Sequence, residues 1–347
     1  MPHDPVDLRS DTVTKPTPEM RRAIAQAVVG DDVFEDDPTV RELEALAAQI
    51  TGKQAALFVA SGTMGNEAAI LAHTRRTDEA VVEAGSHIYK YEVGGPAVLA
   101  GVQLAPLAGE KGILSAERIE AAIRDDDIHQ PVTRLVCLEN THNRAGGVVH
   151  PIEGMREIRA LALQRGLKVH LDGARIFNAA LASGRDVRDY CALADSVMFC
   201  LSKGLGAPIG SMLAGDPDFI LVARRYRKLL GGGMRQAGII AAAGIYALKH
   251  NIARLADDHR RARVLAEAVA AIPSLTVDLD SVQTNIVVID VSGTGRSVDQ
   301  CVLLLEQRGV RVVPFGRTRI RAVTHLDVDD VDVDRAVSVF EQVFVRV

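Results

Sequence analysis

Residues 167–175 read LKVHLDGAR: a short apolar run, an acidic residue at its end, and a glycine at which the chain can turn. Runs of this kind alternate with amphipathic helical stretches along most of the chain. This alternation is typical of a doubly wound α/β domain whose sheet is mostly parallel and largely buried. Ligands bind such sheets at the carboxyl ends of the strands. The sequence therefore predicts that Asp172 lies in a binding site.

The rest of the N-terminal two thirds fits the same architecture. We predict further strands at residues 55–59, 80–83, 135–138, 196–201 and 209–213. Thr39 and Glu42 match a capping box that begins a helix, and Gly52 marks its end. Helices are expected between most of the strands.

The length of 347 residues favours two domains over a single hydrophobic core. After Arg235 the pattern changes to long helical runs, and then to a smaller unit in which strands alternate with a helix. We therefore predict an N-terminal arm and large domain over residues 1–250, followed by a small C-terminal α+β domain over residues 251–347.

Composition argues against several classes of protein. A net charge of −5 with dispersed basic residues disfavours a nucleic acid partner. No run approaches the roughly 18 apolar residues of a membrane span, and the first residues lack an apolar leader, so we expect a cytoplasmic protein without membrane contact. The 4 cysteines are widely spaced and have no histidine cluster nearby, which favours buried free thiols over a metal site.

Residues 199–206 read FCLSKGLG, so Lys203 follows an apolar strand and precedes flexible glycines. Burial disfavours the charged form of an amine, and such a lysine can form a Schiff base with a carbonyl compound. Pyridoxal phosphate acts as an electron sink when its ring nitrogen stays protonated beside a carboxylate, which Asp172 would supply. The turn at residues 61–63 precedes a helix and would offer N–H groups to a phosphate. Together these features predict pyridoxal phosphate as the cofactor.

Short motifs in a fixed order carry a resemblance that covers nearly the whole chain. They are DLRSDTVT at 7–14, GDDV at 30–33, DDPT at 36–39, SGTMGN at 61–66, ENTHN at 139–143, DGARIFN at 172–178, LSKGLG at 201–206, GGGMRQ at 231–236 and THLD at 324–327. In these motifs the chain resembles the low-specificity threonine aldolases, which are fold type I pyridoxal phosphate enzymes related to aspartate aminotransferase. The resemblance implies cleavage of L-threonine, L-allo-threonine or a related β-hydroxy-α-amino acid to glycine and an aldehyde.

The resemblance also implies roles for single residues around the cofactor. Lys203 matches the Schiff-base lysine, and Asp172 matches the partner of the ring nitrogen. Gly62 and Thr63 match the phosphate contacts. His87 is similar to the histidine that stacks on the ring and shields its reacting face.

A second group matches the residues that bind the substrate in the family. Ser10, Arg175 and Arg321 correspond to its substrate-carboxylate group, with Arg175 also beside the cofactor. A planar guanidinium holds a carboxylate through two charge-assisted hydrogen bonds, and this orientation decides which bond at Cα stands perpendicular to the cofactor ring. Tyr91 stands where relatives often have phenylalanine, and it is expected near the aldehyde.

A general base has to remove the hydroxyl proton of the substrate. The resemblance leaves three candidates, namely His87, His129 and an ordered water, and a neutral imidazole near pH 7 suits the task.

The resemblance further implies an oligomer. Lys228 and Arg235 match residues that reach the cofactor phosphate of a neighbouring subunit, as in a homotetramer built from dimers with shared active sites. Phe34 and Glu35 depart from the tyrosine and glycine that many relatives carry, so the hydroxyl at this position is missing.

Two other functions stay open. A β-eliminating lyase of the same fold would release ammonia and a 2-oxo acid instead of glycine and an aldehyde. A non-catalytic regulatory or binding protein would retain the fold without the reaction, but the joint presence of Lys203, Asp172, Arg175 and Arg321 argues against it.

Overall fold

A seven-stranded sheet forms the centre of the larger body in the computed structural model, which describes residues 4–345. Its strands, in spatial order, are β2 (Ala55–Val59), β8 (Ser211–Gly215), β7 (Ser196–Cys200), β6 (Lys168–Asp172), β5 (Thr133–Glu139), β3 (Glu79–Glu83) and β4 (Gln103–Leu107). β8 runs antiparallel to its two neighbours, and the other adjacent pairs are parallel. The mostly parallel sheet that the sequence predicts is confirmed.

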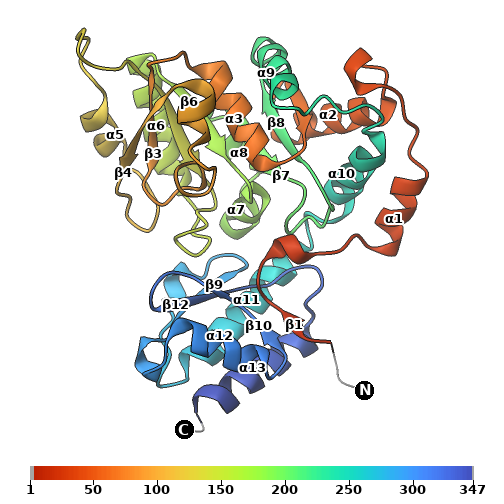
Figure 1. Ribbon diagram of the computed structural model, residues 1–347, viewed down its shortest axis with the longest axis vertical. Coiled ribbons are helices and arrows are strands. Elements are labelled where there is room, and N and C mark those ends of the chain that lie inside the picture. The colour runs from red at the N-terminus through yellow and green to blue at the C-terminus, as the bar shows by residue number, and fades with distance from the viewer. Residues whose placement is uncertain (1–3, 346–347) are drawn as a thin grey trace.

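Helices cover both faces of this sheet (Figure 1). The α-helices are α1 (Pro18–Ala25), α2 (Pro38–Thr51), α3 (Gly62–His73), α4 (His87–Lys90), α5 (Ala116–Ala122), α6 (Ile152–Arg165), α7 (Ile176–Ser183), α8 (Val187–Cys191), α9 (Pro217–Leu229), α10 (Gly238–His250), α11 (Leu255–Ala270), α12 (Val298–Glu306) and α13 (Asp330–Phe344). Val197 and Phe199 of β7 join a core with α2 and α6, whereas Met198 and Cys200 join a second core with α3 and α9. The two-residue period of a strand sends alternate side chains to opposite faces, which explains why this central strand is apolar throughout.

The C-terminal part folds around a core of its own (Figure 1). Its strands form a three-stranded sheet, β11 (Val313–Pro314), β12 (Arg319–Val323) and β9 (Ile286–Asp290), and a parallel pair, β1 (Val6–Asp7) and β10 (Val310–Arg311). Short helical turns lie in the connections: η1 (Asp11–Val13), η2 (Asp32–Phe34), η3 (Pro96–Ala100), η4 (Leu279–Ser281) and η5 (Ser292–Thr294). Val6 and Leu8, from the segment that we expected to be an arm of the large domain, belong to this C-terminal core. The domain boundary near residue 250 stays a prediction.

Helix α2 begins differently from the expectation. Its N-cap is Asp37, whose Oδ1 accepts the backbone N–H groups of Thr39 at 3.1 Å and of Val40 at 3.0 Å. The predicted capping box at Thr39 is therefore wrong, because an aspartate followed by Pro38 in the first turn makes the stronger start. Gly52 ends the helix with a φ of 69°, as predicted.

The edge strand β4 is absent from our sequence-based strands. It contains Pro106, and Gln103 is exposed, so the apolar run is short and interrupted. Proline lacks an N–H group and is tolerated at the edge of a sheet. The pattern of a buried strand is therefore missing from its sequence.

Two expectations about the composition can be compared with the structure. The 4 cysteines are free and buried, as predicted. Within residues 4–345, no helix combines the length and the apolar character that crossing a bilayer requires.

Candidate active site

A cavity of about 280 Å³ lies where the carboxyl ends of the parallel strands meet. β6 ends in Asp172, β7 is followed closely by Lys203, and β2 leads into α3 at Gly62. The predicted residues that line the cavity are Ser10, Gly62, Thr63, His87, Asp172, Arg175, Lys203 and Arg321. The fold thus brings together side chains from distant parts of the sequence, in the position that the strand topology predicts.

Asp172 lies at the bottom of this cavity and is 2% exposed. Its Oδ2 accepts the side-chain amide of Asn66 at 2.9 Å, and its Oδ1 accepts the backbone N–H of Ala174 at 3.1 Å. Two donors therefore hold the carboxylate in one orientation. An acid fixed in this way can act as a permanent partner for a cationic group bound in the cavity.

The amide of Asn66 is itself held by a chain of buried groups. Its Oδ1 lies 3.0 Å from Nε2 of His170, and Nδ1 of His170 lies 2.8 Å from the hydroxyl of Ser196. Because the Asn66 oxygen can only accept, His170 Nε2 must carry the hydrogen and Nδ1 must accept from Ser196. Burial lowers the pKa of His170 to about 3, so this neutral tautomer persists at physiological pH.

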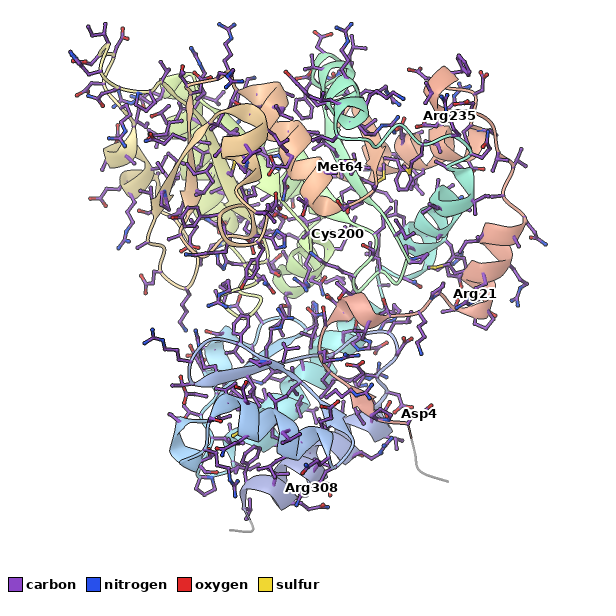
Figure 2. The ribbon with its side chains drawn as sticks, in the orientation of Figure 1. Asp4, Arg21, Met64, Cys200, Arg235 and Arg308 are labelled. Atoms are coloured by element: carbon purple, nitrogen blue, oxygen red, sulfur yellow. The ribbon has the colours of Figure 1, made fainter. Side chains whose placement is uncertain are left out.

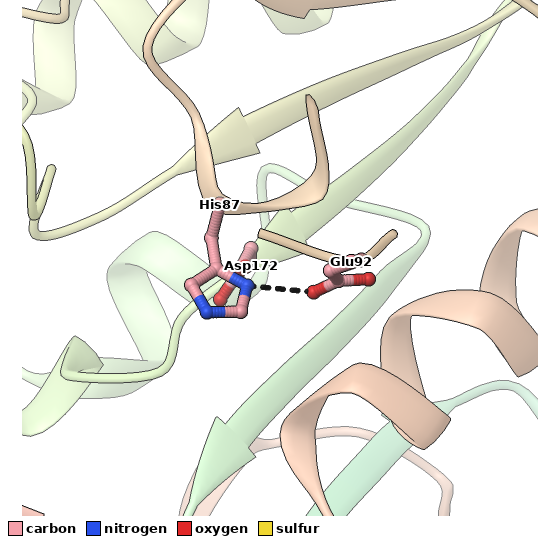
Figure 3. A group of neighbouring side chains, drawn as sticks. All are labelled: His87, Glu92 and Asp172. Atoms are coloured by element: carbon pink, nitrogen blue, oxygen red, sulfur yellow. Dashed lines mark hydrogen bonds and ion pairs between the residues drawn. The ribbon is translucent and has the colours of Figure 1, made fainter. Parts of the chain in front are cut away.

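His87 begins the short helix α4 and lines the cavity together with Asp172; Figure 3 shows its ring beside Glu92. Its Nδ1 lies 2.8 Å from Oε1 of Glu92, and its backbone N–H donates to Glu139 at 2.6 Å. Burial opposes the charged imidazolium, but the hydrogen bond to Glu92 and the nearby carboxylates outweigh it and raise the pKa of His87 above its ordinary value. The ring is therefore anchored at one nitrogen, while the other is left for chemistry.

The turn before α3 has the geometry of an anion site. The hydroxyl of Ser61 caps the helix by accepting the N–H of Met64 at 3.1 Å, which leaves the first N–H groups, at Gly62 and Thr63, to face outward. A Cβ on Gly62 would lie 3.0 Å from Sγ of Cys200, at the end of β7. Figure 2 labels Met64, in the first turn of α3, and Cys200, at the end of β7. Gly62 therefore allows α3 to begin close against the strand that leads to the lysine.

Lys203 is half-buried and lies in a turn directly after β7. Its carbonyl accepts the N–H of Gly206 at 2.8 Å, and Gly206 has a φ of 79°. This tight turn holds the backbone, so the lysine side chain extends from a fixed base into the cavity.

Arg175 forms a buried ion pair with Asp11. Its Nε and Nη2 donate to the two carboxylate oxygens at 2.7 and 2.8 Å, and Asn285 also donates to Asp11, at 3.3 Å. Arg175 is 6% exposed, and Asp11 is fully buried. Burial alone would raise the pKa of the Asp11 carboxyl, but Arg175 holds it well below the usual range. The guanidinium is thus fixed in place, with Nη1 as the group that these two bonds leave for a ligand.

Arg321 reaches the cavity from β12 of the C-terminal body. Its Nη1 donates to Asn143 at 3.0 Å and its Nη2 donates to the backbone carbonyl of Arg9 at 3.2 Å, while Nε is buried without a partner. Burial and the nearby Arg175 lower the pKa of Arg321 from its ordinary value. Arg175 and Arg321, two guanidinium groups on one cavity, form a place for an anionic group of the substrate.

Four of the predicted site residues lie outside the lining of this cavity. Tyr91 is 46% exposed, although its ring lies 5.4 Å from that of His87. The side chain of His129 is 82% exposed, and its Nδ1 contacts Asp127 at 2.7 Å. Lys228 and Arg235 are also exposed, and Arg235 pairs with Asp31 at 3.1 Å. In the part of the chain that the structure describes, none of these four side chains lines the cavity around Lys203, and Tyr91 approaches it through its ring contact with His87.

A larger cavity, of about 470 Å³, lies between β3 and the C-terminal body. Its main ionisable groups pair with each other: His142 with Glu83 at 2.8 Å, and Lys111 with Asp278 at 2.6 Å. Its lysine is thus engaged by Asp278, whereas the smaller cavity has Lys203, Asp172 and two arginines along its lining. The smaller cavity is therefore the candidate active site.

The comparison with known proteins agrees with this choice. The model of the beta-eliminating lyase family matches residues 7–292. The chain belongs to this family. Among its relatives, a probable low-specificity L-threonine aldolase 2 from Arabidopsis thaliana is 48% identical over 98% of this chain and 97% of its own length. A low specificity L-threonine aldolase from Escherichia coli K12 is 45% identical over 93% of this chain and 94% of its own length.

Solved structures of two proteins with low sequence identity share the fold. A threonine aldolase from Leishmania major has a TM-score of 0.84 at 19% identity and covers 97% of this chain and 99% of its own. A putative L-allo-threonine aldolase from Listeria monocytogenes has a TM-score of 0.83 at 20% identity and covers 98% of this chain and 96% of its own. The predicted fold class and the resemblance to low-specificity threonine aldolases are confirmed.

Several members of the site were not given roles from the sequence. Asp11 and Asn66 stand inside motifs that the family resemblance rests on, but their contacts with Arg175 and Asp172 are made across the fold. Glu92 lies in none of these motifs. A buried acid just after a functional histidine is a weak signal, and only the structure identifies it as the partner of His87.

Replacing Asp11 with asparagine should destabilise this family member and disturb Arg175. Removing one charge from a buried pair costs about 3–5 kcal/mol, because the other charge stays buried without its partner. We expect a lower midpoint in thermal unfolding, together with a higher KM for the amino acid substrate. Asp7→Asn is the matched control, since the Asp7–Arg9 pair is partly exposed and such pairs contribute less than about 1 kcal/mol. Equal losses in the two variants would contradict a special role for Asp11.

Proposed function

We infer that this protein catalyses the pyridoxal phosphate-dependent cleavage of L-threonine and related β-hydroxy-α-amino acids to glycine and an aldehyde. The observation that carries the inference is the convergence of Lys203 and Asp172 with the arginine pair Arg175 and Arg321 around one cavity. The relatives named above support the reaction type. The protein is therefore a carbon–carbon lyase.

The residues of the cavity fit pyridoxal phosphate. Lys203 offers an amine for the cofactor aldehyde, and Asp172 offers a buried carboxylate for the ring nitrogen. The N-terminus of α3 offers backbone donors for the phosphate where a Cβ on Gly62 would press on Cys200. His87 is anchored by Glu92 in a position from which its ring could stack on the cofactor. When bound, the cofactor supplies an electron-poor ring that accepts the electron pair of a bond broken at Cα.

The substrate carboxylate would be bound by Arg321 and by the free Nη1 of Arg175, with Ser10 beside them. Arg175 cannot turn away, because Asp11 holds its other two nitrogens. A carboxylate gripped by two fixed guanidinium groups leaves the amino acid little freedom to rotate about its Cα–N bond. A substrate held in one orientation would present one particular bond at Cα to the electron-poor ring that the cofactor would supply, and cleavage of Cα–Cβ over loss of the α-proton requires that this bond be the one presented.

The cleavage itself needs one proton transfer at the substrate hydroxyl. A base removes this proton, the Cα–Cβ bond breaks, the aldehyde departs, and a proton is added at Cα to complete glycine. Nε2 of His87 is the candidate within the cavity, since Nδ1 is engaged by Glu92. His129 stays a candidate only through a neighbouring subunit or a loop movement, and an ordered water is the third possibility.

We propose a homotetramer with active sites shared between subunits. Three ion pairs join the loop around η2 to α9 and to the glycine-rich segment that follows it, namely Arg224–Glu35, Arg227–Asp32 and Arg235–Asp31. The apolar side chains on these two segments are exposed, with Phe34 at 72% and Leu229 at 71%. Apolar surface beside the exposed cationic side chains of Lys228 and Arg235 supports a contact with a second copy of the chain. In such a contact Lys228 and Arg235 would reach a partner's cofactor phosphate, and Tyr91 would lie near the aldehyde.

A cytoplasmic location remains part of the proposal. The free cysteines fit a reducing compartment, where disulfides seldom persist.

The first experiment is product analysis with the purified protein, pyridoxal phosphate and either L-threonine or L-allo-threonine. Glycine and acetaldehyde would establish the aldol cleavage, and the ratio of the two rates would give the preference at the β-carbon. Ammonia with 2-oxobutanoate would instead establish β-elimination, the second candidate, which the family description favours. If neither set of products forms from either substrate, the proposed function is rejected.

Sharing of active sites predicts complementation between two subunits with different defects, measured at a cofactor concentration too low to load Arg235→Ala. Arg235→Ala should weaken retention of the cofactor about tenfold or more, the usual loss for a hydrogen bond to a charged group. Hybrids that contain Arg235→Ala and Lys203→Ala subunits with different tags should be more active than either parent, because one site would combine both intact residues. Hybrids of Lys203→Ala with Asp172→Asn are the control, since both changes affect the same subunit's site. Equal activity in the two hybrids would contradict shared sites.

A further inference from the structure

A buried carboxyl pair adjoins the candidate active site: Glu92 lines the cavity and holds His87, whereas Glu67 lies outside the lining and has no part in the reaction described above. Glu67 follows Asn66 on α3 and is 3% exposed, and Glu92 is also 3% exposed. Both carboxylate oxygens of Glu67 and Oε2 of Glu92 are buried without a hydrogen-bond partner among residues 4–345. The carboxyl group of Glu67 is also packed closely, because a Cβ on Gly95 would lie 1.9 Å from its Oε1. No alternative donor reaches either atom.

Two buried carboxyl groups that face each other cannot both be ionised without a large energetic penalty. A single proton between them removes this penalty, because Glu67 can then donate to Glu92, whose Oε2 has no other partner among residues 4–345. A shared proton agrees with the direction in which the pKa values of Glu67 and Glu92 are shifted. Burial, followed by the proximity of Glu92, raises the pKa of Glu67 to about 8, and burial also raises the pKa of Glu92.

The other oxygen of Glu92 connects this pair to the cavity. Its Oε1 accepts from Nδ1 of His87 and from the amide of Asn66, both at 2.8 Å. Figure 3 shows Nδ1 of His87 directed at Glu92 and the second ring nitrogen directed away from it. The protonation state of Glu67 therefore changes the negative charge available on the Glu92 carboxylate, which accepts the hydrogen bond from His87.

We propose that Glu67 is a positioning residue for the reaction: it holds a proton that it shares with Glu92, keeps Glu92 an acceptor of moderate strength toward Nδ1 of His87, and so leaves Nε2 of His87 neutral and basic. The inference rests on the proposed function only for the role of His87. The shared proton is a property of the protein itself.

Other ionisable groups face this network from every element that packs against it. Asp172 of β6 and Lys203 after β7 act on His87 with opposite signs, and Asp172 also acts on Glu92. Glu139 of β5 binds the backbone N–H of His87, and Cys137 of the same strand lies close to the acids as a neutral thiol, since burial raises its pKa. These groups are unchanged by a substitution at Glu67, so the comparisons below isolate its proton.

Infrared spectroscopy of the complete, cofactor-loaded protein detects the proton directly. We expect a carbonyl band of a neutral carboxylic acid at pH 7 that shifts in D₂O, and we expect this band to be missing in Glu67→Gln. Glu117→Gln, on the exposed start of α5, is the matched control and should keep the band. The absence of such a band in the unsubstituted protein, or its persistence in Glu67→Gln, would overturn the shared proton whatever the outcome of the activity assay.

Thermal unfolding gives a second reading of the same proton. Below pH 4.5 both the folded and the unfolded chain carry it, and between pH 4.5 and about 8 only the folded chain keeps it. The stability contributed by this group therefore falls as the pH rises through this window, and it levels off above it. The unfolding temperature of Glu67→Gln should lack this contribution to the decline. Its difference from the unfolding temperature of the unsubstituted protein should therefore shift in favour of the variant from pH 5 to pH 8. Parallel curves would contradict the proposal.

The pH dependence of kcat/KM for L-threonine tests the effect on His87. Glu67→Leu removes the donor to Glu92, so Glu92 becomes a stronger acceptor and stabilises the imidazolium. The acidic limb should then move to higher pH by about one unit, the size of a charge-assisted hydrogen bond. Glu67→Gln restores a donor and should keep the limb near its original position. If both variants fold and show the original limb, the positioning role is wrong even where the infrared band is present.

Discussion

Replacing Lys203 with alanine should lower kcat for L-threonine cleavage by about 10³-fold or more, because the change removes both the covalent anchor of the cofactor and an amine that can move protons. The substitution should leave the fold intact, since the lysine is half-buried and its turn is closed by backbone hydrogen bonds. The measurement is single-turnover and steady-state release of acetaldehyde. Reduction with borohydride should attach the cofactor to a peptide that contains Lys203 in the unsubstituted protein, and leave it unattached in the variant.

Lys249→Ala provides the control for this result. Lys249 is exposed on α10, where it pairs with Glu42 at 2.8 Å, and its loss should leave turnover unchanged. Turnover close to that of the unsubstituted protein in Lys203→Ala would show that another amine carries the cofactor.

Replacing Asp172 with asparagine should lower kcat by about 100-fold or more while the cofactor still binds. The variant keeps the shape of the side chain but loses the buried negative charge that faces the ring nitrogen, and removal of one preorganised electrostatic partner typically costs 10²–10³ in rate. Cofactor affinity and kcat should therefore respond differently, with the larger change in kcat. Stopped-flow assays at saturating cofactor separate the two quantities.

The matched control is Asp299→Asn, an exposed acid in the first turn of α12. It should affect neither quantity. A loss of activity in Asp172→Asn that excess cofactor fully restores would mean that Asp172 serves cofactor binding alone, and would contradict its role on the ring nitrogen during turnover.

The two substitutions remove different contacts to the cofactor: Lys203→Ala removes the covalent anchor, and Asp172→Asn removes the electrostatic partner. Lys203 follows β7 and Asp172 ends β6, so the covalent anchor and the electrostatic partner come from adjacent parallel strands. The helix N-terminus at Gly62 lies on the far side of β7, across Cys200. One edge of the sheet thus offers three distinct contacts to one elongated ligand, which explains how a cavity of about 280 Å³ can orient it.

The proposed oligomer contact involves residues on the surface, whereas the buried carboxyl pair lies in the interior. Arg235 and Phe34 lie on the surface, where the proposed second copy of the chain would bind, whereas Glu67 lies in the interior. Changes at the surface should alter cofactor retention and assembly. Changes at Glu67 should alter the pH profile and leave assembly intact.

The sequence by itself determined the parts that depend on local pattern. Apolar runs that end in Asp172 or lead to Lys203 indicate strands and their functional ends, because a parallel strand needs a buried run and a turn at its carboxyl end. The motifs around these two residues were sufficient for the cofactor and for the family. The edge strand β4 and the cap of α2 at Asp37 were missed, since a proline interrupts the first and two overlapping caps compete at the second.

Only the tertiary structure decided which side chains share a proton or a charge. Asp11 pairs with Arg175 across 164 positions of the chain, and Asn66 meets Asp172 across 106. The approach of Glu67 to Glu92 likewise depends on how α3 packs against the loop around Gly95. Such contacts are set by the packing of whole elements, and the desolvation that gives them their strength exists only once the core has closed around them.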